Sequence, residues 1–172
     1  MSAQRYTLPA IALHWAMAII ILWLFWLGWT MTDLPKGAGR SAAYSLHKSL
    51  GLLIFLLVFV RLAWRWRHPA PPMLDKGWAE KLARLTHLLL YAFMVLAPLA
   101  GYLASSFTPY AIKLFGIEIP KVGGPDEALN ALFKALHQGL VWGGGALVAL
   151  HLAGAVKQTR RGWGVLRRML PG

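Results

Sequence analysis

Histidines occur in this 172-residue chain at spacings that could hold a metal-containing cofactor. The clearest case is LHQGLVWGGGALVALHLAG, residues 136–154, which carries His137 and His151 with three consecutive glycines between them. Ionisable side chains in such apolar stretches are rare and usually functional. A glycine in a helix interior costs about 1 kcal/mol relative to alanine. A helix with both features is expected to serve a chemical purpose.

The 14-residue interval places the two side chains on one face of a helix. Fourteen steps of about 100° leave them about 40° apart around the axis and about 21 Å apart along it. One metal ion cannot bind both, because metal–imidazole bonds are about 2 Å long. Two separate cofactors at different depths can. Haem meets this requirement, since its iron takes histidines from different helices on the two faces of a flat ring.

Gly144 lies seven residues from each histidine, on the same face. We expect a small residue there to let cofactor rings and neighbouring helices come close. The 14-residue interval recurs, and it pairs His14 with Gly28, His87 with Gly101, and His47 with Arg61. These glycines are predicted to make room for the other ring on helices that do not ligate it.

The elements that must position these residues are four apolar stretches, at about residues 11–31, 44–60, 85–103 and 129–156. Each is close to the roughly 20 residues that a membrane-spanning helix needs. Hydrophobic residues make up 58% of the chain and charged residues 14%, which is more apolar surface than a soluble domain of this size can bury. We therefore predict an all-α membrane protein: a four-helix transmembrane bundle in which residues 1–172 form one domain.

The basic residues predict the orientation of this bundle. Twelve of the 18 lysines and arginines lie on the side that holds both termini, so the positive-inside rule places both termini in the cytoplasm. The net charge of +12 is attributed to this asymmetry and to attraction to anionic lipid, and we expect no nucleic-acid partner. The twelve are Arg5, Arg61, Arg65, Arg67, Lys76, Lys81, Arg84, Lys157, Arg160, Arg161, Arg167 and Arg168.

Orientation gives each histidine a depth. The outer level holds His47 and His137, and the inner level holds His14, His87 and His151. Depth alone leaves His14 and His87 tied as partner of His151. At the inner level Arg61, with Arg65 one turn later, is predicted to meet anionic haem propionates, because an arginine fork suits a carboxylate.

Two histidines have other interpretations. His87 could hydrogen-bond a neighbouring helix, or serve a quinone site together with Tyr91 one turn further along. His68, in a proline-rich loop, is expected to be solvated. Because the chain has no cysteine, disulfides, iron–sulfur clusters and covalently attached haem are excluded.

Four motifs in this order resemble the bacterial cytochrome b561 family: LHW at His14, LHKSLG at His47, THLLLYAFMVLAPLAG from Thr86, and LHQGLVWGGGALVALHLAG. Cytochrome b subunits of nickel–iron hydrogenases and formate dehydrogenases are more distantly similar. The resemblance covers nearly the whole chain. It implies that His14 and His151 ligate a cytoplasmic-side haem b, and that His47 and His137 ligate a periplasmic-side haem b. It therefore selects His14 over His87.

An iron with two histidine ligands has no open position and transfers electrons. Members of the resembling family exchange electrons with ubiquinol or ubiquinone in the bacterial inner membrane, and superoxide oxidase activity occurs among them. We therefore expect electron transfer between ubiquinone and a periplasmic one-electron partner, with superoxide as a candidate. Lys48 and Lys134, beside the outer ligands, could attract a small anion, or could snorkel or pair with propionates.

Two other classes of protein remain open at this stage. A membrane anchor would relay electrons for a separate periplasmic dehydrogenase, hydrogenase or carrier, with residues 105–130 as its docking surface. A small transporter or non-haem metal protein has less support, and it predicts a colourless protein. The oligomeric state is not determined by the sequence.

Overall fold

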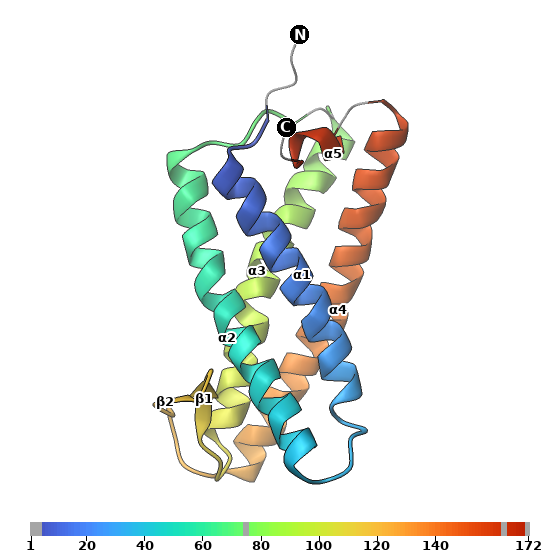
Figure 1. Cartoon of the computed structure of the whole chain (residues 1–172). Coiled ribbons are helices and arrows are strands. Elements are labelled where there is room, and N and C mark those ends of the chain that lie inside the picture. The colour runs from blue at the N-terminus through green and yellow to red at the C-terminus, as the bar shows by residue number, and fades with distance from the viewer. Residues whose placement is uncertain (1–4, 74–75, 163–164, 171–172) are drawn as a thin grey trace.

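The computed structural model describes residues 5–73, 76–162 and 165–170, and four long helices make up most of it (Figure 1). Each of the four is long and apolar enough to cross a membrane. The predicted helical membrane protein with four spans is therefore confirmed. In chain order the elements are α1 (Leu8–Thr30), α2 (Ala38–Arg67), α3 (Trp78–Ser106), β1 (Ile112–Leu114), β2 (Ile117–Ile119), α4 (Glu127–Arg160) and α5 (Val165–Arg168).

The helices extend beyond the apolar stretches predicted from the sequence. The helix around residues 44–60 begins at Ala38 and ends at Arg67, because polar and basic residues at a span end still form helix where the backbone meets water. Its end is set by Pro69, since a residue before proline is disfavoured in helical geometry. α4 begins at a capped end, where the Asp126 carboxylate accepts a hydrogen bond from the Leu129 N–H at 2.9 Å.

The hairpin and the short α5 were not predicted, so the all-α expectation was incomplete. β1 and β2 pair antiparallel, with Ile112 opposite Ile119 and Leu114 opposite Ile117. The connection is the two-residue turn Phe115–Gly116, and both residues have positive φ, 49° and 94°. Two positive φ values are the signature of a type I′ turn, which usually carries Asn-Gly. The Phe-Gly dipeptide is a weak signal for such a turn.

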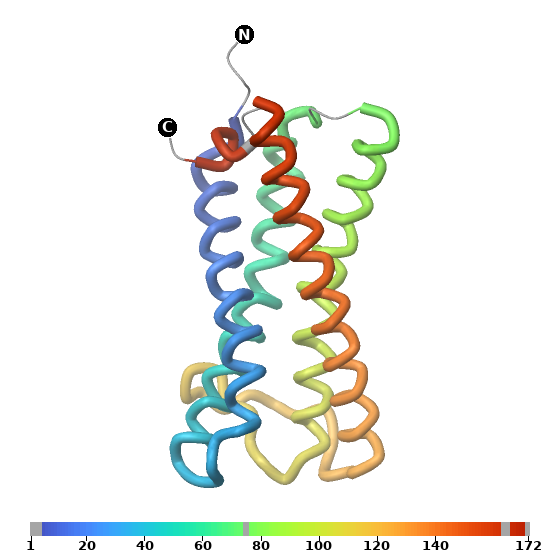
Figure 2. The backbone as a smooth tube through the Cα atoms, turned by 90° about the vertical axis from the view of Figure 1, so that its right-hand side faces the viewer, coloured from blue at the N-terminus to red at the C-terminus, as the bar shows by residue number. Residues whose placement is uncertain are grey.

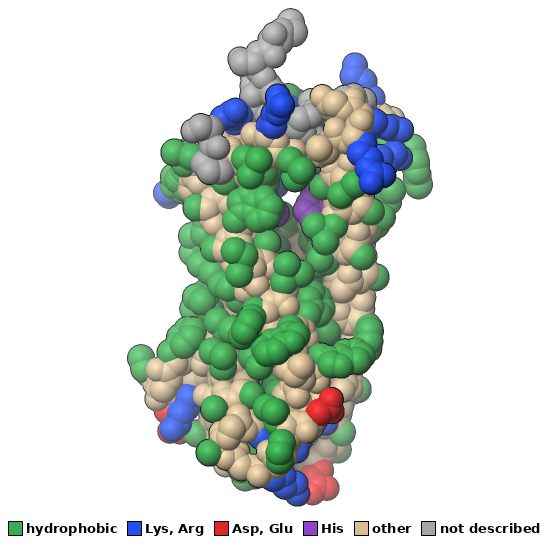
Figure 3. All heavy atoms as spheres, turned by 45° about the vertical axis from the view of Figure 1, so that its right-hand side comes forward, with side chains coloured by type: hydrophobic (Ala, Val, Ile, Leu, Met, Phe, Trp, Pro, Cys, Tyr) green, Lys and Arg blue, Asp and Glu red, His purple; other side chains and the backbone are tan. Residues whose placement is uncertain are grey.

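The four long helices pack antiparallel in a bundle that is long enough to cross a bilayer. The described ends of the chain lie at one end of the bundle, and the hairpin lies near the other, beside α2 (Figures 1 and 2). A small buried cluster of Met17, Ile54 and Val58 joins α1 to α2. In the view of Figure 3, apolar side chains cover the middle of the molecule and charged ones gather toward its ends. This banding matches a bilayer flanked by two polar interfaces.

Candidate cofactor site

Four of the predicted histidines come together as two pairs at different depths of the bundle. The ring centroids of His14 on α1 and His151 on α4 are 6.1 Å apart. Those of His47 on α2 and His137 on α4 are 6.2 Å apart. All four side chains are half-buried. α4 thus contributes one histidine to each pair, and different helices supply the partners.

The separation within each pair suits a shared iron. A metal–imidazole nitrogen bond is about 2 Å long, and each ring nitrogen lies about 1 Å from its ring centroid, so two imidazoles on one metal have centroids about 6 Å apart. The ring planes in the two pairs are inclined by 69° and 84°, which excludes face-to-face stacking as the reason for their proximity. The residues present therefore fit two haem groups held by paired histidines.

The surroundings of the Nδ1 atoms in the outer pair, His47 and His137, also favour metal binding. His137 Nδ1 lies 2.8 Å from the Ala97 carbonyl oxygen, which can only accept a hydrogen bond. The proton is therefore on Nδ1, and Nε2 keeps its lone pair for a metal. Among the described residues, His47 Nδ1 is buried without a hydrogen-bond partner. A polar atom of this kind is costly unless something else engages the ring.

The inner pair carries the arginine predicted to lie there. Arg61 donates from Nε to the Tyr91 hydroxyl at 3.1 Å and from Nη1 to the Ala10 carbonyl at 3.4 Å, and its Nη2 lies 3.3 Å from His14 Nδ1. A guanidinium can only donate, so His14 accepts at Nδ1 in this arrangement. A metal at His14 Nε2 would require the contact between Arg61 and His14 Nδ1 to break. The propionate contact itself remains a prediction.

A third histidine lies at the inner level. The His87 ring centroid is 5.5 Å from that of His151, closer than the His14 ring. Both separations are close to the roughly 6 Å that a shared metal imposes, so the assignment of His14 as the partner still rests on the family resemblance. In the described part of the chain, no three His, Cys, Asp or Glu side chains form a metal-binding group. The structure thus brings His87 beside the inner pair.

Two glycines of the 14-residue pattern lie against the outer imidazoles. A Cβ atom at Gly28 would be 3.1 Å from His47 Cε1, and one at Gly101 would be 3.1 Å from His137 Nδ1. These contacts are tighter than ordinary van der Waals packing. Gly28 on α1 and Gly101 on α3 therefore leave room for rings supplied by α2 and α4.

Gly144 accommodates an aromatic pair that the sequence analysis did not identify. The Phe25 and Phe93 rings are stacked, with centroids 6.0 Å apart and planes inclined by 10°. A Cβ atom at the buried Gly144 would overlap the Phe93 ring, and one at Gly145 would touch Phe25. The position midway along α4 is thus packed by phenylalanines from α1 and α3. Sequence spacing did not single out these two phenylalanines, because the segments around them contain other aromatic residues.

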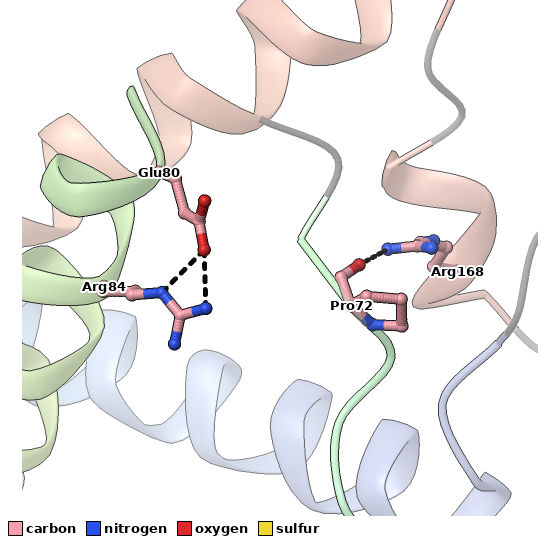
Figure 4. Close-up of polar contacts among 4 residues, drawn as sticks. All are labelled: Pro72, Glu80, Arg84 and Arg168. Atoms are coloured by element: carbon pink, nitrogen blue, oxygen red, sulfur yellow. Dashed lines mark hydrogen bonds and ion pairs between the residues drawn. The ribbon is translucent and has the colours of Figure 1, made fainter. Parts of the chain in front are cut away.

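A cavity of about 460 Å³ opens at the end of the bundle that holds the termini, between α2, α3 and the loop joining them. Its apolar lining consists of Leu62, Ala70, Pro71, Pro72, Met73 and Leu88, and Arg65, Arg84, His87 and Tyr91 supply its polar groups. Its loop wall is tied to α5, because Arg168 donates from Nη1 to the Pro72 carbonyl at 2.8 Å (Figure 4). Arg84, also in the lining, pairs with Glu80 at 2.6 Å. The cavity therefore combines apolar walls with hydrogen-bond donors beside the inner histidines.

Comparison with known proteins agrees with this geometry. The family description "Prokaryotic cytochrome b561" matches residues 5–172. Cytochrome b561 homolog 2 of Escherichia coli is 33% identical over 152 residues, covering 86% of this chain and 81% of that protein. Cytochrome b561 homolog 1 of Escherichia coli is 27% identical, covering 89% of each chain. The probable superoxide oxidase CybB of Yersinia pestis is 24% identical, covering 78% of this chain and 77% of that protein.

Replacement of Gly144 by alanine is expected to destabilise the protein, because the new Cβ overlaps the Phe93 ring. Overpacking of this kind costs about 1–3 kcal/mol. Gly143→Ala is the matched control, since nothing lies within 4 Å of its Cβ position, and alanine gains up to about 1 kcal/mol in helix propensity. Thermal unfolding of the purified protein in detergent measures both effects. Equal melting temperatures for the two variants would contradict the packing described here.

Proposed function

The chain belongs to the prokaryotic cytochrome b561 family, and on this premise we propose that it carries electrons between ubiquinone and a one-electron partner across the inner membrane through two haem b groups. Family membership and the four apolar helices make it a multi-pass membrane haem protein that transfers electrons. The number of haems, the quinone and the partner are the proposed parts. The observation that carries them is the presence of two imidazole pairs, 6.1 Å and 6.2 Å apart, at two depths.

The chain's own residues account for this role. His14 and His151 would hold one haem, and His47 and His137 the other. Haem b bound by two histidines supplies one-electron transfer and offers no open iron position for O₂. The 14-residue step from His137 to His151 on α4 separates the pairs by about 21 Å along the axis. The protein thus spans the bilayer with redox sites near both faces.

The cavity beside the inner pair is the proposed quinone site. Its volume, about 460 Å³, lies within the range of about 300–1,000 Å³ that is usual for small-molecule sites. Apolar walls suit a quinone ring and tail, and the Tyr91 hydroxyl, the His87 imidazole and the Arg65 guanidinium can donate to quinone oxygens. His87 lies 5.5 Å from His151, so a quinone there would be next to the inner redox site.

The outer level supports superoxide as the one-electron partner. Lys48 follows the outer ligand His47 directly and lies within electrostatic reach of Lys121. Lys134, one turn before His137, is exposed. Clustered cations raise the local concentration of a small anion. Two superoxide anions would each release one electron and leave as O₂, and one quinone would take both electrons with two protons to become quinol.

A relative described as a probable superoxide oxidase favours this partner over the alternative. In the alternative, the chain is a membrane anchor that relays electrons for a separate periplasmic dehydrogenase or hydrogenase. The two proposals share the haem sites and differ in whether the pure protein works without a partner protein. The excess of basic residues at the end that holds the termini supports a cytoplasmic location for that end.

Alanine variants of the histidines test the haem assignment. Each of four single variants should lower the haem content from two per chain to one, because a haem that loses one of its two axial ligands is no longer retained. They are His14→Ala, His47→Ala, His137→Ala and His151→Ala. His87→Ala and His68→Ala should keep both. Pyridine haemochrome assay against protein concentration gives the ratio. Loss of a haem from the His87 variant alone, with both retained in the His14 variant, would reverse the inner pairing.

Charge reversal at the outer face tests superoxide as the partner. The protein with both Lys48→Glu and Lys134→Glu should be reduced by superoxide about tenfold more slowly at low salt, since attraction becomes repulsion. The difference should shrink as ionic strength rises. Stopped-flow haem absorbance followed by addition of ubiquinone measures both steps. A wild-type protein that superoxide does not reduce would instead favour the membrane anchor.

Filling the cavity tests the quinone site. Ala70→Trp places an indole in the loop wall and should raise the KM for ubiquinone about tenfold, equivalent to about 1.4 kcal/mol of lost binding. Ala153→Trp is the control, because Ala153 is exposed on α4 at a similar depth. Haem spectra and reduction by dithionite should be normal in both variants. An unchanged KM in the Ala70 variant would exclude this cavity.

A further inference from the structure

The β1–β2 hairpin has one apolar face and one charged face. Alternation along the strands and the pairing register place Ile112, Leu114, Ile117 and Ile119 on one side. Lys113 and Glu118 lie opposite each other on the other side, and both are exposed. In a hairpin between membrane helices, an apolar face across both strands is expected only where both strands contact an apolar environment. The apolar face therefore needs an apolar neighbour both at its β1 side and at its β2 side.

Part of the apolar face is already packed on the bundle. Ile112 on β1 is 1% exposed, and β1 is the strand that packs against α2 and α3. β2 pairs with β1 and lies further out (Figure 1). Ile117 on β2 belongs to the same face, yet it is 72% exposed. The apolar face thus begins in the protein interior and continues past the edge of the bundle without a protein partner in the described residues.

The turn of the hairpin is fixed at a defined position on α2. Ser49, which is 2% exposed, donates from its hydroxyl to the Lys113 carbonyl at 3.1 Å and accepts from the Phe115 N–H at 3.0 Å. Ser49 lies five residues, or about 8 Å along a helix, past the start of the predicted apolar stretch at Tyr44. The turn is therefore held beside the outer part of a membrane-spanning helix and not beyond its end.

The flank of α2 below the turn faces lipid. Leu56 follows Ser49 by seven residues, which returns to nearly the same face of the helix about 10 Å further along, and it is 52% exposed. In a protein that crosses a bilayer, an exposed leucine at mid-span contacts acyl chains. The hairpin consequently lies on the lipid side of α2, at the level where headgroups give way to hydrocarbon.

Contact with lipid explains the choice of Phe at position 115 better than the backbone conformation of the turn does. Phe115 has φ of 49°, where a bulky residue is unfavourable and Asn is usual. Its side chain is 58% exposed, so packing inside the protein does not explain the choice. Phe is among the apolar residues that interfacial segments bury at the headgroup–acyl boundary, which gives an exposed Phe at this depth a physical reason.

We propose that the hairpin is an interfacial lipid anchor, in which Phe115 and Ile117 contact the acyl-chain boundary of the adjacent leaflet while Lys113 and Glu118 face water. The anchor would brace the outer end of α2 two residues from His47. This proposal does not depend on the identity of the electron partner or on the quinone site.

The absence of cysteine in the chain makes single spin-label sites clean to introduce. Phe115→Cys, Ile117→Cys and Glu118→Cys are labelled in the haem-loaded protein, which is reconstituted at one copy per phosphatidylcholine–phosphatidylglycerol nanodisc. Leu56→Cys is the lipid-facing reference, and Asp33→Cys, in an exposed loop, is the water-facing one. Collision rates with O₂, which concentrates in lipid, and with a water-soluble nickel chelate are then compared.

Labels at 115 and 117 should show a ratio of O₂ to nickel collisions several-fold higher than the label at 118, and between the ratios at 33 and at 56. Ratios like that at 33 would overturn the proposal, and so would protection from both reagents, which indicates cover by protein. If the Phe115→Cys protein fails to fold, the comparison of 117 with 118 decides alone. Phe115→Asn adds an independent readout: its turn should be at least as stable in detergent, and a large fall in melting temperature there would show that Phe115 serves internal packing.

Discussion

Two imidazoles must lie about 6 Å apart, at one depth and on different helices, for a haem iron to bind between them. Two histidine pairs in this structure meet that distance, at different depths of the bundle. α4 supplies one histidine to each pair from a single face, and α1 and α2 supply the partners. The helices cannot all carry large side chains at these levels, because the imidazoles occupy the space between them. Glycines at 28 and 101 are the local consequence.

The part of the bundle between the two histidine pairs is filled by aromatic side chains. Between the two histidine pairs, the stacked rings of Phe25 and Phe93 pack α1 and α3 against Gly144 on α4. Gly144 removes the side chain that would overlap this pair. The helix-propensity cost of a glycine in α4 is thus offset by contacts between aromatic rings from two other helices.

The two ends of the bundle differ in chemistry, as transfer of electrons across a bilayer requires. The end that holds the termini combines an arginine-rich rim with a cavity whose donors adjoin His151. The other end has lysines near His47 and His137 and a hairpin bonded to Ser49. A small soluble anion suits the second surface, and an apolar two-electron carrier suits the first. These two surfaces are the basis of the proposed electron transfer between a quinone and a small anion.

Hydrophobic length in the sequence was enough to predict four membrane helices, and the 14-residue interval was enough to place His137 and His151 on one helix face at different depths, because both follow from the fixed rise and turn of a helix. Periodicity along one helix carries no information about which helix lies opposite. Only the tertiary structure therefore showed that both His14 and His87 lie near His151, placed Arg61 against His14 and Tyr91, and brought Phe25 and Phe93 onto Gly144. The hairpin escaped prediction for a related reason: a Phe-Gly turn is a weak local signal, and Ser49, 64 residues away from Lys113, holds it in place.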